Sequence, residues 1–322
     1  MRLHLTTPGL DGKEERRMLQ KNSQTTGLIY AIFCYLCWGL FPLYFLLTAP
    51  ASPLEIVAER VVFSLVFCLL LLLLTGQLRS LGLYLKDRRQ LGLSLLASLL
   101  IFVNWLLYVL ATTQSMVMEA SLGYYINPIV SVALGVVFLG ERLRRLQWVG
   151  VALAGLAVLV MIFFYGTVPW LGLGLAFSFG FYGLVKKSIG PVPALLSLTI
   201  ETLLLTPLAA LLLSYFAVSG QLTLVSEGTS HFFLLAASGV VTAIPLLLFA
   251  GAASRVPLSL LGIVQYIGPT VQFFLALWVT QEQLSAGRWA GFVLVWLAAF
   301  FFVLDALRAN PRLPSRGKKA EN

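Results

Sequence analysis

The chain has 322 residues, of which 59% are apolar and only 11% are charged. Soluble domains carry about 25% charged residues, so this composition excludes an ordinary soluble protein. The apolar residues come in runs of about 20, the length that crosses a bilayer as a helix, and the chain is predicted to be an all-α integral membrane protein. The net charge of +9 does not indicate nucleic-acid binding, because the basic residues are spread between the apolar runs.

Ten apolar runs predict ten transmembrane helices. A polar leader (1–25) precedes the first run, and a basic tail (308–322) follows the last. The sixth run is short and rich in glycine, and small residues at every fourth position in it predict a ridge for close helix packing: Gly172, Ala176 and Gly180. The runs lie at about 26–47, 55–75, 91–112, 118–139, 148–165, 170–185, 194–216, 231–250, 258–279 and 287–307.

Lysine and arginine alternate with the predicted spans. They gather before the first span and after the second, fourth, sixth, eighth and tenth spans. Cytoplasmic loops carry the positive excess, so both termini are predicted to be cytoplasmic, with the basic tail near the lipid bilayer. The loops on the other side contain neither residue: 48–54, 113–117, 166–169, 217–230 and 280–286.

Two apolar stretches are predicted to be copies of each other. They read "YYINPIVSVALGVVFLGERL" at 124–143 and "QYIGPTVQFFLALWVTQEQL" at 265–284, and they align without gaps at an offset of 141 positions. A proline inside an apolar helix frees a backbone carbonyl, so the matched prolines predict a loosened backbone in mid-membrane that serves the function. The alignment pairs rare residues in register: Pro128 with Pro269, Glu141 with Glu282 and Trp148 with Trp289.

The offset corresponds to five spans, which is an odd number. The two halves, 26–165 and 166–307, are therefore predicted to lie upside down relative to each other, as two inverted five-helix repeats. Elsewhere the halves match weakly, although Glu59 and Glu201 lie near the same offset. Inverted repeats about an axis in the membrane plane are the architecture of secondary transporters.

These stretches, extended to "EASLGYYINPIVSVALGVVFLGERL" at 119–143, resemble the EamA family of the drug/metabolite transporter superfamily. Within it they are most similar to the RarD-type, chloramphenicol-sensitivity permease branch. The chain departs from that branch at Glu59-Arg60, where a His-Arg pair is usual, and at Gln281-Glu282, where Gly-Glu is usual. The resemblance implies a permease or exporter of small molecules in the plasma (inner) membrane of a bacterium, and it names no substrate.

Polar groups at membrane depth are functional candidates, because each costs on the order of 2.5–3.5 kcal/mol on insertion scales. Gln265 and Gln272 are seven positions apart on one helical face, and Asn104 and Tyr108 are four apart on another. Such groups suit a cavity that holds a polar or aromatic small molecule; the alternatives are hydrogen bonding between packed helices and, for the prolines, a packing kink. The predicted substrate-binding residues are Asn104, Trp105, Tyr108, Tyr125, Asn127, Pro128, Gln265, Tyr266, Pro269 and Gln272.

The glutamates divide by position. Glu201 lies about a third of the way through the seventh span and is the best candidate for proton coupling, because apolar burial favours a protonated carboxyl. Glu59 is the second candidate. It and Arg60 point about 100° apart and are not expected to pair; the alternative is that both snorkel to the outer interface. Three others are expected to act at gates or helix ends: Glu119, Glu141 and Glu282.

The sequence therefore predicts a secondary active transporter of a small organic molecule, drug or metabolite, that works by alternating access and is proton- or exchange-driven. No phosphate-binding G-x-x-x-x-G-K-[ST] motif and no H-E-x-x-H motif occurs, and Cys34-x-x-Cys37 has no histidine partner. No catalytic residue, metal or cofactor is predicted, and the chain is not expected to be an enzyme. The expected partners are the substrate and the lipid bilayer, with no nucleic acid; the sequence leaves a homodimer open. The alternative function is a non-transporting membrane scaffold or sensor on the same fold.

Overall fold

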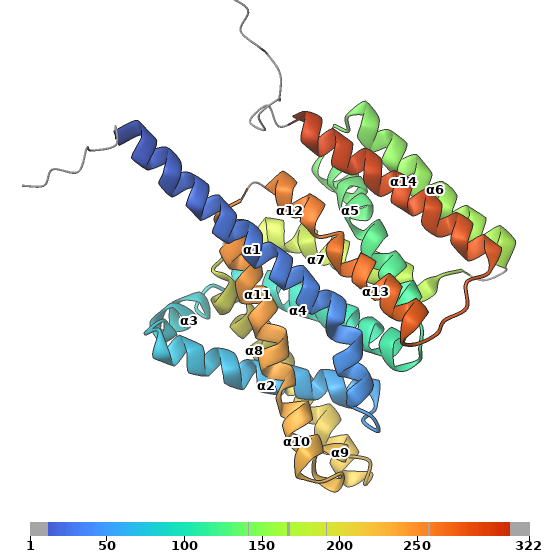
Figure 1. The fold of residues 1–322 in the computed structure, drawn as a ribbon. Helices are drawn as coiled ribbons and strands as arrows, with labels where there is room; N and C mark the ends of the chain where they lie inside the picture. The colour runs from blue at the N-terminus through green and yellow to red at the C-terminus, as the bar shows by residue number, and fades with distance from the viewer. Residues whose placement is uncertain (1–11, 141, 166–167, 191, 257, 310–322) are drawn as a thin grey trace, which may run out of the picture.

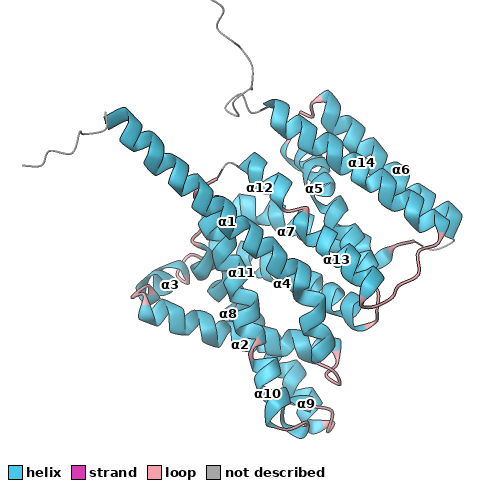
Figure 2. Ribbon diagram, in the orientation of Figure 1, coloured by secondary structure: helices cyan, strands magenta, loops and turns pink. Residues whose placement is uncertain are grey.

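The computed structural model describes residues 12–140, 142–165, 168–190, 192–256 and 258–309. All regular secondary structure in these ranges is helical (Figure 2). Nine helical segments of the described chain are long and apolar enough to cross a membrane. The prediction of an all-α, multi-pass membrane protein is confirmed.

The helices of the first half begin at recognisable capping residues. Ser52 accepts a hydrogen bond from the backbone N–H of Glu55 (3.3 Å) at the start of α2, and Pro53 occupies a first-turn position where its missing N–H costs nothing. α1 begins before the predicted span, and its apolar part starts at Ser23. The helices of this half are α1 (Gly12–Leu47), α2 (Pro53–Leu74), α3 (Leu78–Tyr84), α4 (Arg88–Thr113), α5 (Val117–Leu139) and α6 (Arg145–Tyr165).

The second half contains one long helix, α7, that is not among the nine apolar spans. The prediction of ten spans therefore rests on α7. The helices are α7 (Trp170–Ile189), α8 (Ala194–Val218), α9 (Thr223–Ser226), α10 (Thr229–Ala236), α11 (Ser238–Ala253), α12 (Leu258–Val264), α13 (Ile267–Trp278) and α14 (Ala286–Ala309).

Glycines allow α7 to pack closely against α5. A Cβ atom added to Gly123 on α5 would lie 2.6 Å from the carbonyl oxygen of Gly172, and one added to Gly172 would lie 2.9 Å from the carbonyl oxygen of Glu119. A Cβ on Gly180 would meet Leu134 at 2.9 Å. The predicted small-residue ridge is confirmed, since a larger residue at these positions would force the two helices apart. α7 also packs against α4, so it carries its side chains into the middle of the bundle.

The fourth and ninth spans differ although their sequences align. α5 continues without interruption through Pro128, whereas the ninth span is divided into α12 and α13, with Gln265 and Tyr266 between them. Pro269 lies in the first turn of α13, where no intrahelical N–H bond is lost. The matched prolines thus lie in different settings, one inside a continuous helix and one just after an interruption.

The helices pack in pairs that relate the two halves. α2 packs on α8, α5 on α13, and α6 on α14, and the last pair lies side by side in Figure 1. α1 packs on α11 and α13, just as α7 packs on α4 and α5. If α1 is matched with α7, α4 with α11 and α5 with α13, the contacts of one half reproduce those of the other. A two-fold repeat requires this pattern.

Candidate functional site

A cavity of about 390 Å³ lies between the two halves of the chain. Its wall includes residues of α1, α2, α4 and α5 from the first half and of α7, α8, α11 and α13 from the second. The volume falls in the range of small-molecule sites, about 300–1,000 Å³. Aromatic side chains form much of the wall: Tyr35, Trp38, Phe41, Trp105, Tyr108, Tyr124, Phe179, Tyr182 and Phe249.

The structure brings most of the predicted substrate-binding residues to this cavity. Those in its wall are Asn104, Trp105, Tyr108, Asn127, Gln265, Pro269 and Gln272. Tyr125, Pro128 and Tyr266 are not among the residues that line it. The rings of Tyr125 and Tyr266 stack with centroids 5.9 Å apart, and Tyr125 Oη lies 2.7 Å from Thr270 Oγ1. These two tyrosines therefore join α5 to the ninth span.

The buried amides line the cavity and also hold helices together. Asn104 Nδ2 donates to the carbonyl of Leu175 and to Ser178 Oγ on α7, at 3.0 Å each. Gln272 Nε2 donates to Tyr108 Oη at 3.1 Å and to the carbonyl of Trp38 at 3.2 Å. The two roles proposed for these amides from the sequence are thus combined in the same side chains.

Two residues of the wall each carry a buried acceptor atom without a hydrogen-bond partner among the described residues. Gln272 Oε1 and Asn127 Oδ1 have no hydrogen-bond partner in the part of the chain that the structure describes. Buried polar atoms are normally hydrogen-bonded, and leaving one without a partner costs about 1–3 kcal/mol. A ligand with an N–H or O–H group would provide the missing donor.

Glu201 on α8 belongs to an ion pair. Its Oε1 lies 2.8 Å from Lys186 Nζ and accepts from Ser197 Oγ at 3.0 Å. Tyr182 Oη lies 3.2 Å from both carboxylate oxygens, and Lys186 also contacts Ser197. The sequence placed Glu201 inside the seventh span, which is α8, but assigned Lys186 to the loop after the sixth span. α7 extends to Ile189, and this extension brings the lysine to the cavity wall.

Arg60 on α2 also lines the cavity, and sequence analysis did not assign it to the site. It is only 4% exposed, and its guanidinium carbon lies 4.1 Å from the centroid of the Trp105 ring. Its Nε donates to Thr242 Oγ1 at 2.7 Å, while Nη1 is buried without a partner among the described residues. The snorkelling alternative does not describe this residue. The signal in the sequence was an arginine within an apolar span, which is costly and therefore functional by default.

Glu59 and Glu55 lie one turn apart on α2 and differ sharply. Both are fully buried. Glu55 Oε1 accepts from the backbone N–H groups of Thr223 (2.6 Å) and Leu224 (3.2 Å), so it anchors the start of α9, a role that the sequence did not indicate. Neither oxygen of Glu59 has a partner within the described ranges, and Glu59 is not part of the cavity wall.

The lining residues occur in pairs with the sequence offset of the repeat. Each member of a pair lies 141 positions from the other, and both line the cavity. The offset seen in the fourth and ninth spans therefore extends over most of the cavity wall. The pairs are Trp38 with Phe179, Phe41 with Tyr182, Arg60 with Glu201, Trp105 with Leu246, Tyr108 with Phe249, Tyr124 with Gln265 and Asn127 with Gly268.

Comparison with known proteins decides the family. The EamA-like transporter family model matches residues 25–163. The chain is 47% identical to Protein RarD of Streptomyces exfoliatus, over 93% of this chain and 95% of that protein. It is 41% identical to the uncharacterized transporter YojE of Bacillus subtilis (strain 168), over 90% of this chain and 97% of that protein. The chain is a RarD-type member of the EamA-like transporter family. A crystal structure with 18% identity shares the fold, with a TM-score of 0.58 over 88% of this chain and 99% of the other.

In this RarD-type chain, Glu282 stabilises the start of a helix in the opposite half. Its carboxylate accepts from the backbone N–H groups of Val117 (2.7 Å) and Met118 (3.1 Å), at the N-terminus of α5, where Met116 supplies no side-chain cap. Burial raises the pKa of the Glu282 carboxyl, and these donors act in the opposite direction. The helix-end expectation for Glu282 agrees with this geometry. Its counterpart, Glu141, lies outside the described residues.

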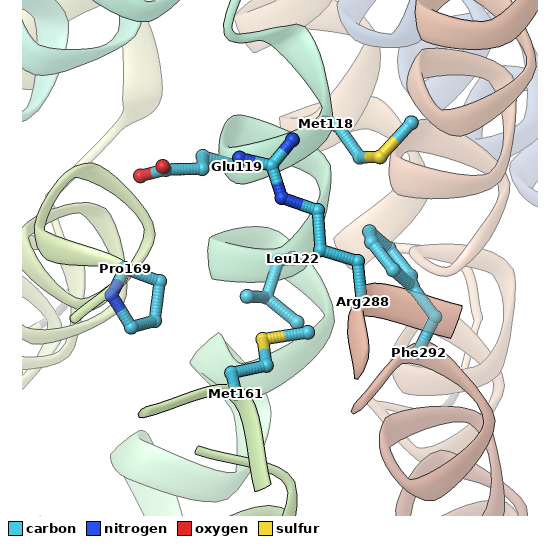
Figure 3. A pocket seen from close by; sticks show the side chains of 7 residues that line it. All are labelled: Met118, Glu119, Leu122, Met161, Pro169, Arg288 and Phe292. Carbon is cyan, nitrogen blue, oxygen red and sulfur yellow. The ribbon is translucent and has the colours of Figure 1, made fainter. Parts of the chain in front are cut away.

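Glu119 lies at a second, much smaller cavity of about 20 Å³. Figure 3 shows its carboxylate pointing away from the guanidinium of Arg288, toward the side of Pro169, and Arg288 comes from the first turn of α14. The remaining lining residues are Met118, Leu122, Met161, Pro169 and Phe292. A volume of this size holds about one water molecule and no organic ligand. The Glu119 carboxylate accepts hydrogen bonds from the backbone N–H groups of Leu171 and Gly172 in the first turn of α7. Glu119 therefore lies where α5 meets the start of α7, close to Arg288 of α14.

Proposed function

We propose that this chain is a secondary active transporter that moves a small organic molecule, a drug or metabolite, by alternating access. The observation that carries the proposal is the cavity of about 390 Å³ whose wall is built from both halves. Movement of one half against the other would open such a cavity to each side of the membrane in turn. The relatives that are named as transporters support the same conclusion, and no enzymatic activity is proposed.

The proposed architecture is ten transmembrane helices in two inverted repeats, 26–165 and 166–307. α7 is the tenth span, and the paired packing of the helices and the paired lining residues support the repeat. The proposed location is the plasma membrane of a bacterium, with both termini in the cytoplasm; the distribution of lysine and arginine supports this orientation of the termini. The proposed partners are the substrate and the bilayer, with no nucleic acid, and the sequence does not decide between a monomer and a homodimer.

Proton coupling is the second part of the proposal. Glu201 is the first candidate, because protonation of its carboxylate would weaken the ion pair with Lys186 and change the charge that faces the cavity. Glu59 is the second candidate. Its carboxyl is fully buried and has no hydrogen-bond partner among the described residues, so binding or release of a proton there would change the charge inside the helix bundle.

Transport measured in liposomes tests the first part. Candidate solutes come from an untargeted comparison of metabolites between a deletion strain and an overexpressing strain. The purified full-length chain is then expected to move at least one of these solutes, and Gln272→Ala is expected to slow it, because this change removes two hydrogen bonds at the cavity wall. Gln77→Ala, at an exposed amide outside the cavity, is the matched control.

The same experiment separates the transporter from the alternative. A scaffold or sensor would move none of the solutes, and its cellular effect would be unchanged by Gln272→Ala. For the coupling, the rate is expected to depend on an imposed pH gradient and to lose this dependence in Glu201→Gln. A rate that ignores the gradient in the wild-type chain would exclude proton coupling and leave the transporter proposal standing.

A further inference from the structure

The positive charges of the ionisable groups in the cavity wall outnumber the negative charges. Lys186 and Glu201 form an ion pair with 2.8 Å between Nζ and Oε1. Arg60 has no carboxylate within ion-pair distance among the described residues. The guanidinium of arginine stays protonated in proteins. The described lining residues therefore leave the cavity with an uncompensated positive charge on Arg60.

The guanidinium of Arg60 is fixed in position by its surroundings. Its guanidinium carbon lies 4.1 Å from the centroid of the Trp105 ring, and the centroids of the Phe41 and Phe45 rings lie 5.7 and 5.8 Å from it. The hydrogen bond from Nε to Thr242 holds the orientation. This arrangement leaves Nη1 as a buried donor whose partner is absent from the described part of the chain. A donor held in this way loses little further freedom when it binds an acceptor.

The described residues place no anion against Arg60. Glu59 precedes it on α2, so the two side chains leave the helix about 100° apart, and neither Glu59 oxygen accepts a hydrogen bond from a described residue. The nearby groups in the wall are the phenols of Tyr108 and Tyr124, whose rings pack with centroids 5.5 Å apart. A buried charge that lacks a partner is strongly unfavourable, so a bound anion would be strongly favoured at this position.

We infer that the substrate of this site is an amphiphilic organic anion. Its carboxylate binds Arg60, and its apolar body lies against the aromatic wall that Trp38, Phe179 and Phe249 form on the α1, α7 and α11 sides. The inference rests on the proposed function, since it names the substrate class of the same cavity. A charge-assisted hydrogen bond to a buried guanidinium favours the anion over a neutral analogue, and the positive charge repels a cation.

Three probes with one carbon skeleton isolate the effect of charge. They are 3-phenylpropionate, 3-phenylpropanamide and 3-phenylpropylamine, which are anionic, neutral and cationic at neutral pH. Binding to the purified full-length chain is measured by titration calorimetry, with protein-free detergent as the blank. We expect 3-phenylpropionate to bind at least about tenfold more tightly than the amide or the amine, the effect of one charge-assisted hydrogen bond. Sodium chloride and acetate at equal concentrations are expected to compete weakly, because neither has a body that reaches the aromatic wall.

The variant Arg60→Gln assigns the preference to this residue. We expect it to bind the three probes within about threefold of one another, because the charged donor that distinguishes them is gone. Arg255→Gln is the matched control, since Arg255 is exposed and outside the cavity, and it is expected to keep the wild-type preference. If Arg60→Gln does not fold, the comparison of the three probes on the wild-type chain still tests the inference.

Several results would overturn the inference: equal binding of the acid and the amide, no binding of 3-phenylpropionate at its solubility limit, displacement of it by chloride at equal concentration, or an unchanged preference in Arg60→Gln. The transporter proposal fails in a different way. Selective binding of 3-phenylpropionate without uptake into liposomes would keep the substrate class and reject transport. Uptake of a cation that is insensitive to Arg60→Gln would keep transport and reject the substrate class.

Discussion

The second long helix of each half, α2 or α8, places an ionisable residue in the cavity wall. The two buried charges are surrounded by different kinds of side chain. Arg60 on α2 and Glu201 on α8 are 141 positions apart, the offset of the repeat. Glu201 is surrounded by polar donors, including Tyr182 and Lys186 of α7. At the same offset from these two residues stand Phe41 and Phe45 of α1, and their rings face Arg60.

This difference shows how a repeated scaffold produces an asymmetric site. α1 and α7 occupy equivalent places, but one supplies aromatic rings and the other supplies a phenol and an ammonium group. The charge of Glu201 on the α8 side is therefore compensated by Lys186, whereas the charge of Arg60 on the α2 side has no counter-ion among the described residues. The predictions below alter one side at a time, from the largest expected effect to the smallest.

The variant Lys186→Met removes the compensation on the α8 side. Glu201 is then buried with its hydroxyl partners but without its cation, and we expect a loss of about 3 kcal/mol in the free energy of unfolding, the low end for a broken buried pair because the lysine side chain is 25% exposed. Thermal unfolding in detergent measures the change. The double variant Lys186→Met/Glu201→Leu is expected to recover most of the loss, and the exposed neighbour provides the control Lys187→Met. A single variant as stable as the double variant would contradict the assignment of a compensated pair.

The variant Trp105→Leu weakens the α2 side and makes it resemble its counterpart, which carries Leu246. The guanidinium of Arg60 then loses the ring that lies 4.1 Å away, and a desolvated cation–π contact contributes about 2 kcal/mol. We expect a lower melting temperature and weaker binding of 3-phenylpropionate. Trp170→Leu, at a side chain that is 72% exposed, is the control. Unchanged binding and stability would show that the ring does not support Arg60.

The variant Tyr182→Phe changes one hydrogen bond on the α8 side and makes this position match Phe41. The loss of the phenol hydroxyl leaves Glu201 with Lys186 and Ser197, so we expect a destabilisation of only about 1 kcal/mol. The melting temperature measures it, with Tyr215→Phe at an exposed phenol on α8 as control. A loss as large as that of Lys186→Met would mean that the hydroxyl, and not the ammonium group, holds the carboxylate.

Hydropathy in the sequence was sufficient to predict the fold class. Apolar runs locate the helices because hydrocarbon accepts no unpaired backbone groups. The cavity wall was predictable at Asn104, Gln272 and Glu201 because polar groups at membrane depth are costly and need a reason.

The partners across helices were not predictable, because they depend on how each helix is rotated about its axis. Lys186 meets Glu201 only because close contacts at glycines set α7 against α5. The sequence paired Glu59 with Glu201, whereas the offset of 141 pairs Arg60 with it. A shift of one residue turns a side chain by about 100° and moves it to another face of the helix. Likewise, aligned prolines did not predict that only the ninth span is interrupted, since that depends on where each helix starts.

The variant Glu59→Gln is expected to have the smallest effect. It tests whether this acid contributes to stability or to proton coupling on the α2 side. Both Glu59 oxygens lack a partner in the described chain, so replacing the carboxyl by an amide of nearly the same shape breaks no hydrogen bond there, and stability should change by less than about 1 kcal/mol. Glu55→Gln is the matched comparison one turn away, where the carboxylate caps α9 and the loss should be larger. Liposome transport should keep its response to a pH gradient in Glu59→Gln and lose it in Glu201→Gln. If Glu59→Gln lost the response and Glu201→Gln kept it, Glu59 would be the proton-coupling residue. The α2 side would then bind both the anion and the proton.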